Sequence, residues 1–424
     1  MLLDYITRKA LLKYLSLHLF TFAAMFFIPF EATSGDWVKL QILNLTFITL
    51  TTSTAVLISK TRIATPLPNL DYTQEQRIKK TIKWCSMIAI LGVFFISYDR
   101  LFIRGIDYSE GLRAARYQWL GTTGGSGFGI LGNLFLPMAY VGVFLLYIHK
   151  DLFKLKNFFF ILVTCLGPIF GHAALNGGRS NLLLAAVILL CAHCLRRRTP
   201  ETSTARKSPF FLICGLSLIF LAATAYIFYI IKSSARMGAV ETIDLLYLGA
   251  ESLYGTPKNG RSIDQLSDLE SMLIYTIIYL IHGQWTSQIS LSESTTIGSY
   301  FLYPFSVLLS RTGLFPEALN SGMFSESGAL ISLPGALAYD FGPLGVVFGS
   351  IFLGISLGFC FRSLKGKRGL SGVGLAFVVY ILSTTFLSPF ITASGFFYLN
   401  FIFFGFLATG LINFAIYRKR VRLV

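Results

Sequence analysis

Four arginines lie within a short charged segment at residues 98–116, and their spacing suits the binding of an oxyanion. Arg100 and Arg104 are four residues apart. Arg113 and Arg116 are three apart, so each pair shares one face wherever the segment is helical. Two neighbouring guanidinium forks match the oxygens of a diphosphate, which accept paired N–H bonds. The alternative is internal salt bridging with the carboxylates of the same segment, Asp99, Asp107 and Glu110.

Two further arginines occupy positions where a ligand phosphate could reach them. Arg179 follows Asn176-Gly-Gly and precedes an apolar stretch. Glycines allow a close backbone approach, and the start of the following helix adds a partial positive charge. Arg236 follows another apolar stretch and opens a long loop at 232–332. We predict Arg179 and Arg236 as catalytic residues, with anchoring at the membrane surface as the alternative for both.

A histidine and an aspartate complete the candidate residues. His282 lies in the aromatic-rich stretch 275–285 and could serve as a general base for a sugar hydroxyl, the alternative being an ordinary surface hydrogen bond. His172, just before the Arg179 turn, is a weaker candidate. Asp340 stands at the outer end of an apolar stretch, where a carboxylate is costly without a partner. It is predicted to hold an outer arginine in place or to accept a proton, and we count it with the substrate-binding residues.

No motif in the chain indicates a cofactor or a metal. The run from Gly127 to Gly132 matches the glycine spacing of a dinucleotide site, but it enters an apolar stretch and follows no strand. Cys191 and Cys194 have the spacing of a redox pair without a thioredoxin-like context, so we interpret them as packing residues. The prediction is a site without cofactor or metal, in which arginines supply the positive charge.

The elements that must position these residues are membrane helices. The chain of 424 residues is 54% hydrophobic and 13% charged, with a mean hydropathy of +0.66. This composition is typical of a polytopic membrane protein. It predicts an all-α transmembrane bundle, one integral membrane domain over 1–424, with a large periplasmic loop subdomain at 232–332. The ten predicted spans are 14–31, 38–59, 82–98, 128–148, 157–175, 180–195, 209–231, 333–361, 370–389 and 393–416. Within the large loop, 271–283 and 297–310 are favoured as interfacial helices, and twelve spans result if they cross as well.

Loop charges alternate with these spans. Loops assigned to the cytoplasm, together with both termini, hold 25 Lys/Arg and 5 Asp/Glu, whereas the outer segments hold 11 and 15. The positive-inside bias of an inserted protein predicts this asymmetry, and it accounts for the net charge of +16 without nucleic acid as a partner. Eight of the eleven outer basic residues are Arg, which favours bidentate oxyanion binding.

These features together resemble bacterial oligosaccharide repeat-unit polymerases, the O-antigen polymerase family. The matching segments are Asp99-Arg-Leu-Phe-Ile-Arg-Gly105, Gly177-Gly-Arg-Ser-Asn-Leu-Leu183 and Ala338-Tyr-Asp-Phe-Gly-Pro-Leu-Gly345, and the large late outer loop also matches. The resemblance implies an inner-membrane glycosyltransferase that joins undecaprenyl diphosphate-linked oligosaccharides on the periplasmic face, with a chain-length regulator protein as a further partner. The family carries functional arginines in its outer loops, which correspond here to Arg179 and Arg236.

Two other functions remain open at this point. The related O-antigen ligases transfer the same donor to a lipid core sugar and pair arginines with a histidine, a part that His282 could take. A flippase or other transporter of lipid-linked oligosaccharides is the alternative of a different class. Transporters commonly place ionisable residues near the middle of the bilayer, whereas the spans here are nearly free of charge. That difference favours an enzyme working on one side of the membrane.

Overall fold

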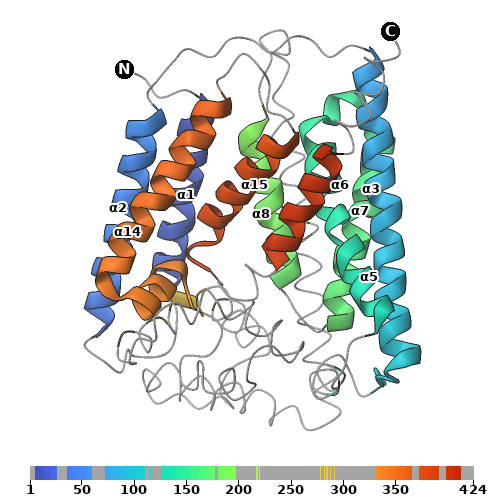
Figure 1. Cartoon of the computed structure of the whole chain (residues 1–424), viewed down its shortest axis with the longest axis horizontal. Helices are drawn as coiled ribbons and strands as arrows, with labels where there is room; N and C mark the ends of the chain where they lie inside the picture. The colour runs from blue at the N-terminus through green and yellow to red at the C-terminus, as the bar shows by residue number, and fades with distance from the viewer. Residues whose placement is uncertain are drawn as a thin grey trace. The chain divides into compact units, whose positions relative to one another are not determined.

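The computed structural model describes residues 5–25, 36–59, 72–109, 126–176, 180–196, 331–364, 372–390 and 398–411, with scattered single positions between them. These residues are almost entirely helical, and no strand occurs among them (Figure 1). They belong to two compact units. The first comprises Met1–Thr61, Ala235–Arg362 and Thr384–Phe397, and the second comprises Arg62–Ser234, Ser363–Ser383 and Tyr398–Val424.

Five helices of the described part are long and apolar enough to cross a membrane. They are Trp37–Ser59, Thr73–Ile103, Gly127–Ile148, Leu155–Asn176 and Leu333–Leu364. The predicted spans 38–59, 82–98, 128–148, 157–175 and 333–361 fall within these five helices, which confirms an all-helical protein with several membrane-spanning candidates. Shorter apolar helices, Ser180–Leu195, Val373–Leu387 and Tyr398–Leu411, occupy three more of the predicted stretches.

The remaining predicted spans are described only in part or not at all. Helix α1 covers Tyr5–Met25, so it begins well before the predicted start of the first span at residue 14. Nearly all of 209–231 lies outside the described residues, as do most of 271–283 and all of 297–310. The count of ten or twelve spans therefore stays a prediction.

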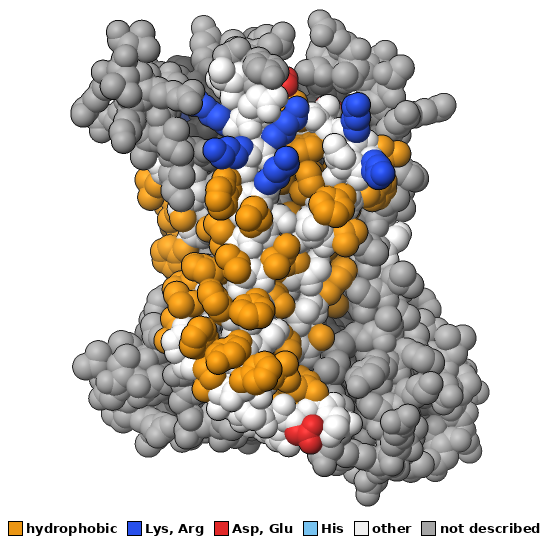
Figure 2. Space-filling model, turned by 90° about the vertical axis from the view of Figure 1, so that its right-hand side faces the viewer, with side chains coloured by type: hydrophobic (Ala, Val, Ile, Leu, Met, Phe, Trp, Pro, Cys, Tyr) orange, Lys and Arg blue, Asp and Glu red, His pale blue; other side chains and the backbone are white. Residues whose placement is uncertain are grey.

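Helix α3 (Tyr72–Tyr98), together with the turn at Asp99–Ile103 that continues it, has an exposed apolar face. Trp84 is 52% exposed, Phe94 61% and Phe102 73%, and Figure 2 shows an apolar band with lysine and arginine side chains gathered at one end. At a rise of about 1.5 Å per residue, Trp84 and Phe102 are about 27 Å apart along the axis, close to the roughly 30 Å of a bilayer's hydrocarbon layer. Large apolar side chains left open over that length are expected to face lipid.

In the second unit, two groups of basic residues lie at opposite ends of the helices. The C-terminal ends of α3 and α7 (Leu155–Asn176) meet, since Arg100, two residues after α3, donates to Asn176 over 2.9 Å. Helix α6 (Pro137–Ile148) and helix α8 (Ser180–Leu195) end near the start of α7, where Arg196 bonds Asp151 over 2.6 Å. Eight basic residues of the described ranges lie at that end: Arg77, Lys79, Lys80, Lys83, Lys150, Lys154, Lys156 and Arg196. All of these belong to the predicted cytoplasmic segments, and Arg100 and Arg104 lie at the opposite end.

Glycines bring α3 and α5 (Gly127–Phe135) into close contact. A Cβ on Gly132 would lie 2.5 Å from the side chain of Ile96 and 2.8 Å from the carbonyl oxygen of Gly92. A Cβ on Gly92 would lie 2.8 Å from the backbone nitrogen of Leu136. The glycine run that resembles a dinucleotide motif thus serves helix packing. Cys191 and Cys194 are buried free thiols in α8, as predicted for packing residues.

Gly132→Ala is expected to destabilise the protein by about 1–3 kcal/mol, because the added methyl group meets backbone that cannot move aside easily. The matched control is Gly127→Ala in the same helix, where a Cβ meets nothing within 4 Å. The measurement is SDS-driven unfolding of the purified protein in mixed micelles. Equal unfolding free energies for the two variants would contradict this account of the contact.

In the first unit, α14 (Leu333–Leu364) packs on α2 (Asp36–Ser59) through small residues. A Cβ on Gly354 would lie 2.7 Å from the carbonyl oxygen of Thr51, and one on Gly358 would lie 2.5 Å from Ile58. The spacing of the two glycines puts both on one face, where the absence of side chains allows close helix packing. Helix α14 is broken at Gly342, where φ is +67°, immediately before Pro343. Residues 333–340 before the break are all buried, whereas Phe341 at the break is exposed.

Candidate functional site

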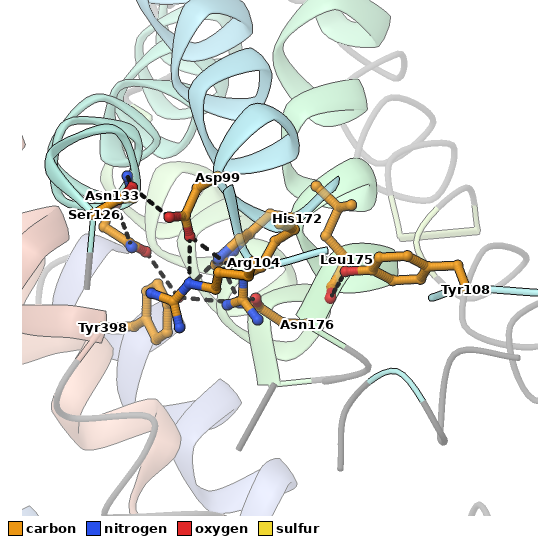
Figure 3. Close-up of polar contacts among 11 residues, drawn as sticks. Asp99, Arg104, Tyr108, Ser126, Asn133, His172, Leu175, Asn176 and Tyr398 are labelled. Carbon is orange, nitrogen blue, oxygen red and sulfur yellow. Dashed lines mark hydrogen bonds and ion pairs between the residues drawn. The ribbon is translucent and has the colours of Figure 1, made fainter. Parts of the chain in front are cut away.

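The arginine pair sits where helix α3 widens into a π-helical turn, η1 (Asp99–Ile103). Asp99 is 1% exposed and lies between the two guanidinium groups. Its Oδ2 is 2.9 Å from Nε of Arg104 and 3.9 Å from Nε of Arg100. Figure 3 shows Arg104 directed at this carboxylate. The predicted common face is therefore confirmed for this pair, and so is part of the alternative, since Asp99 is indeed a salt-bridge partner.

The carboxylate of Asp99 is also tied to the start of α5. The hydroxyl of Ser126 donates to its Oδ1. Ser126 caps α5, because its oxygen accepts the backbone N–H of Gly129 over 3.1 Å. A Cβ on Gly129 would come within 2.9 Å of Oδ2, so glycine at this position leaves room for the carboxylate. Asp99 is thus fixed from two helices before any ligand arrives.

Arg100 is held by a neutral side chain. Its NH2 group donates to Oδ1 of Asn176 over 2.9 Å. The amide nitrogen of Asn176 faces Nε2 of His172 at 2.5 Å, and the hydroxyl of Tyr398 lies 2.9 Å from the same ring nitrogen. On the other side of the ring, the amide of Asn181 lies 2.9 Å from Nδ1. The result is a continuous chain of contacts from Arg100 through α7 into α8.

The contacts of Asn176 determine the tautomer of His172. Since Oδ1 of Asn176 accepts from Arg100, only its N–H₂ group remains for the ring, and Nε2 must accept. The ring proton is then on Nδ1. Oδ1 of Asn181 is buried without a hydrogen-bond partner. A half-turn of that amide lets Oδ1 accept the Nδ1–H, as this tautomer of the ring requires.

The site keeps a formal positive charge. Within the described ranges, Asp99, Arg100 and Arg104 together carry +1, and the other groups seen to hold them there are hydroxyls, amides and a neutral imidazole. Tyr108 borders Arg100, and burial raises the pKa of its hydroxyl while the guanidinium partly offsets that effect. The hydroxyl therefore stays protonated and donates to the carbonyl of Leu175. An arrangement of this kind favours an anion with several oxygens.

The remaining carboxylates of the arginine segment behave differently. Hydrogen bonds from the backbone and side chain of Ser109 lower the pKa of Asp107, which keeps it ionised. Asp107 makes no ion pair with any residue of the described ranges. Glu110 lies outside those ranges. Of the predicted salt-bridge partners, only Asp99 is seen in that role.

Several predicted site residues lie outside the described part of the chain. They are Arg113, Arg116, Arg179, Arg236 and His282. Asp340 is described and fully buried, on the short piece of α14 in the first unit. Tyr398 and Asn133 also belong to the site, although the sequence does not indicate either of them as a site residue. The hydroxyl of Tyr398 lies 3.3 Å from Oδ1 of Asn133, but no local pattern marks two polar residues so far apart in sequence.

Comparison with protein-family models, with characterised proteins and with solved structures finds no match to this chain.

Proposed function

We propose that this protein is a membrane glycosyltransferase that polymerises undecaprenyl diphosphate-linked oligosaccharide repeat units on the periplasmic face of the bacterial inner membrane. The observation that carries the proposal is the buried Arg100 and Arg104 pair, which Asp99 and Asn176 hold in place. It lies at the end of the second unit opposite the eight basic residues, where the positive-inside rule assigns the periplasm.

The chemistry needs what this pair offers. A hydroxyl of the incoming repeat unit attacks the anomeric carbon of the growing glycan. The bond from that carbon to the diphosphate oxygen breaks, and undecaprenyl diphosphate leaves with the electron pair. A base takes the hydroxyl proton, the role proposed for His282. Guanidinium groups already fixed in place stabilise the negative charge on the leaving oxygens. Arg179 and Arg236 are proposed to contribute further positive charge to that stabilisation.

The test is a reconstitution with one substrate. Purified protein in proteoliposomes is incubated with a lipid-linked repeat unit, and the products are separated on a gel. A ladder of glycans is expected. Transfer of a single unit to an added lipid core sugar, without a ladder, would identify a ligase. Unchanged substrate in both reactions would contradict a glycosyltransferase.

A transporter of lipid-linked oligosaccharides is the second candidate, and one observation favours it. Helix α14 breaks at Gly342 and Pro343, next to the fully buried Asp340. Broken helices with buried ionisable groups are common in secondary transporters. If proteoliposomes moved a lipid-linked repeat unit across the bilayer and built no ladder, this candidate would replace the polymerase.

Polymer formation is expected to continue unchanged in EDTA, because the arginines provide the positive charge that a divalent ion supplies in many diphosphate enzymes. The measurement is the initial rate of ladder formation by protein purified with and without the chelator. Loss of activity in EDTA that is restored by a divalent ion would contradict the prediction.

A further inference from the structure

The ring of His172 joins the end of α7 to the start of α8. Asn176 is the last residue of α7 and Asn181 lies in the first turn of α8, and the two amides bond the two nitrogens of one imidazole. We propose that His172 is a positioning residue that fixes Arg100 and these two helix ends as one isoprenyl-diphosphate site. This inference rests on the proposed function and adds residues that the proposed function does not include.

The burial of His172 argues for positioning rather than for contact with substrate. The residue is 1% exposed, and both ring nitrogens are occupied by protein groups. A base for a sugar hydroxyl needs a free lone pair within reach of that hydroxyl. The contacts of His172 instead fix the side chains around it, which then present their other atoms to a ligand.

The effect on Arg100 passes through one amide. Asn176 can accept from the guanidinium only while its oxygen points that way, and its bond to Nε2 of His172 keeps it there. Without the ring nitrogen the amide can rotate, and the donors of Arg100 lose their common direction. Bidentate binding depends on that direction more than on charge.

The neutrality of this support preserves the charge of the site. A carboxylate in place of Asn176 would hold Arg100 equally well, but it would cancel the positive charge that an anion needs. An amide held by a neutral imidazole orients the guanidinium without adding a negative charge of its own. Tyr398 adds a second contact to Nε2, the third to the ring, and links the ring to Asn133 on α5.

The test compares two buried histidines of the same unit. His193 bonds the hydroxyl of Tyr147 over 2.8 Å at the opposite end of the second unit, so His193→Phe is the matched control for His172→Phe. The probes are farnesyl diphosphate and farnesyl monophosphate, with binding measured on purified protein in nanodiscs. His172→Phe is expected to weaken diphosphate binding about 10- to 100-fold, the range for losing an oriented hydrogen bond to a charged group. It should also lose the preference for diphosphate over monophosphate, which His193→Phe keeps.

Two further variants keep the test decisive if His172→Phe folds poorly. Asn181→Ala removes one anchor of the ring and is expected to weaken diphosphate binding in the same direction. In the double variant His172→Phe with Asn176→Ala, binding is expected to be no weaker than with Asn176→Ala alone, because the ring acts through that amide.

The outcomes separate the two proposals. If the wild-type protein binds no farnesyl diphosphate, the proposed function fails. If it does bind, and His172→Phe and Asn181→Ala keep both affinity and diphosphate preference, the positioning role is overturned while the proposed function stands. Equal losses in His172→Phe and His193→Phe would also overturn it, since they would reflect a general loss of structure.

Discussion

Arg100→Ala is expected to lower the initial rate of polymer formation by about 100- to 1000-fold, the range for removing one preorganised group that stabilises developing negative charge. The guanidinium is fixed by Asn176 at 2.9 Å before substrate binds, so no reorganisation is needed during the reaction. Arg100→Lys should recover only part of the rate, since one ammonium cannot bond the amide and the diphosphate in the same fork geometry.

The control for this experiment lies at the other end of the second unit. Arg196 also pairs with a carboxylate, that of Asp151 at 2.6 Å, but among the basic residues assigned to the cytoplasm. Arg196→Ala should leave the rate close to that of the wild type. Ladder formation in proteoliposomes, normalised to protein abundance, provides the measurement. A wild-type rate in Arg100→Ala would remove this arginine from the proposed mechanism.

Asp99→Ala is expected to reduce the free energy of unfolding by about 3–5 kcal/mol, because it leaves two buried guanidinium groups without their shared carboxylate. The side chain of Asp99 is 2% exposed, and those of Arg100 and Arg104 are 5% and 15% exposed. Water can therefore do little to replace the lost charge. The loss includes the tie to Ser126 at the start of α5.

Two variants test whether the charge or the packing is responsible. Asp151→Ala removes a carboxylate whose side chain is 69% exposed, and it should cost less than about 1 kcal/mol. The double variant Asp99→Leu with Arg104→Met should recover part of the stability by removing one unpaired charge together with the carboxylate. SDS-driven unfolding in mixed micelles measures all of these variants. If Asp99→Ala and Asp151→Ala reduced the free energy of unfolding equally, the buried charge cluster would not stabilise the protein as predicted.

The membrane helices were predictable because their signal is local. A span is identified by its own run of apolar residues, and α2, α7 and α14 each contain the run that marks them. The helix-packing glycines of α14 were predictable for the same reason, since Gly354 and Gly358 share a face by spacing alone. The break at Gly342 and Pro343 is locally visible too, but the burial of the piece before it depends on distant segments.

The arginine site was predictable only in part. The spacing of Arg100 and Arg104 indicated a shared face, and the types of residue indicated an oxyanion. The choice of Asp99 over Asp107 as their partner was not predictable, because it depends on the π-helical turn and on Ser126, which approaches from another helix. Sequence spacing indicates which residues can be close together, and the packing of the helices determines which of them form contacts.

The sequence by itself determined the class of this protein: apolar helices with cations at one end and a set of arginines at the other, because hydropathy and charge act on each segment separately. Only the tertiary structure decided how those arginines are held. His172, Asn181 and Tyr398 come from three helices, and 226 residues separate His172 from Tyr398. Hydrogen bonds between such distant residues form only when the helices have packed, so no local pattern records them.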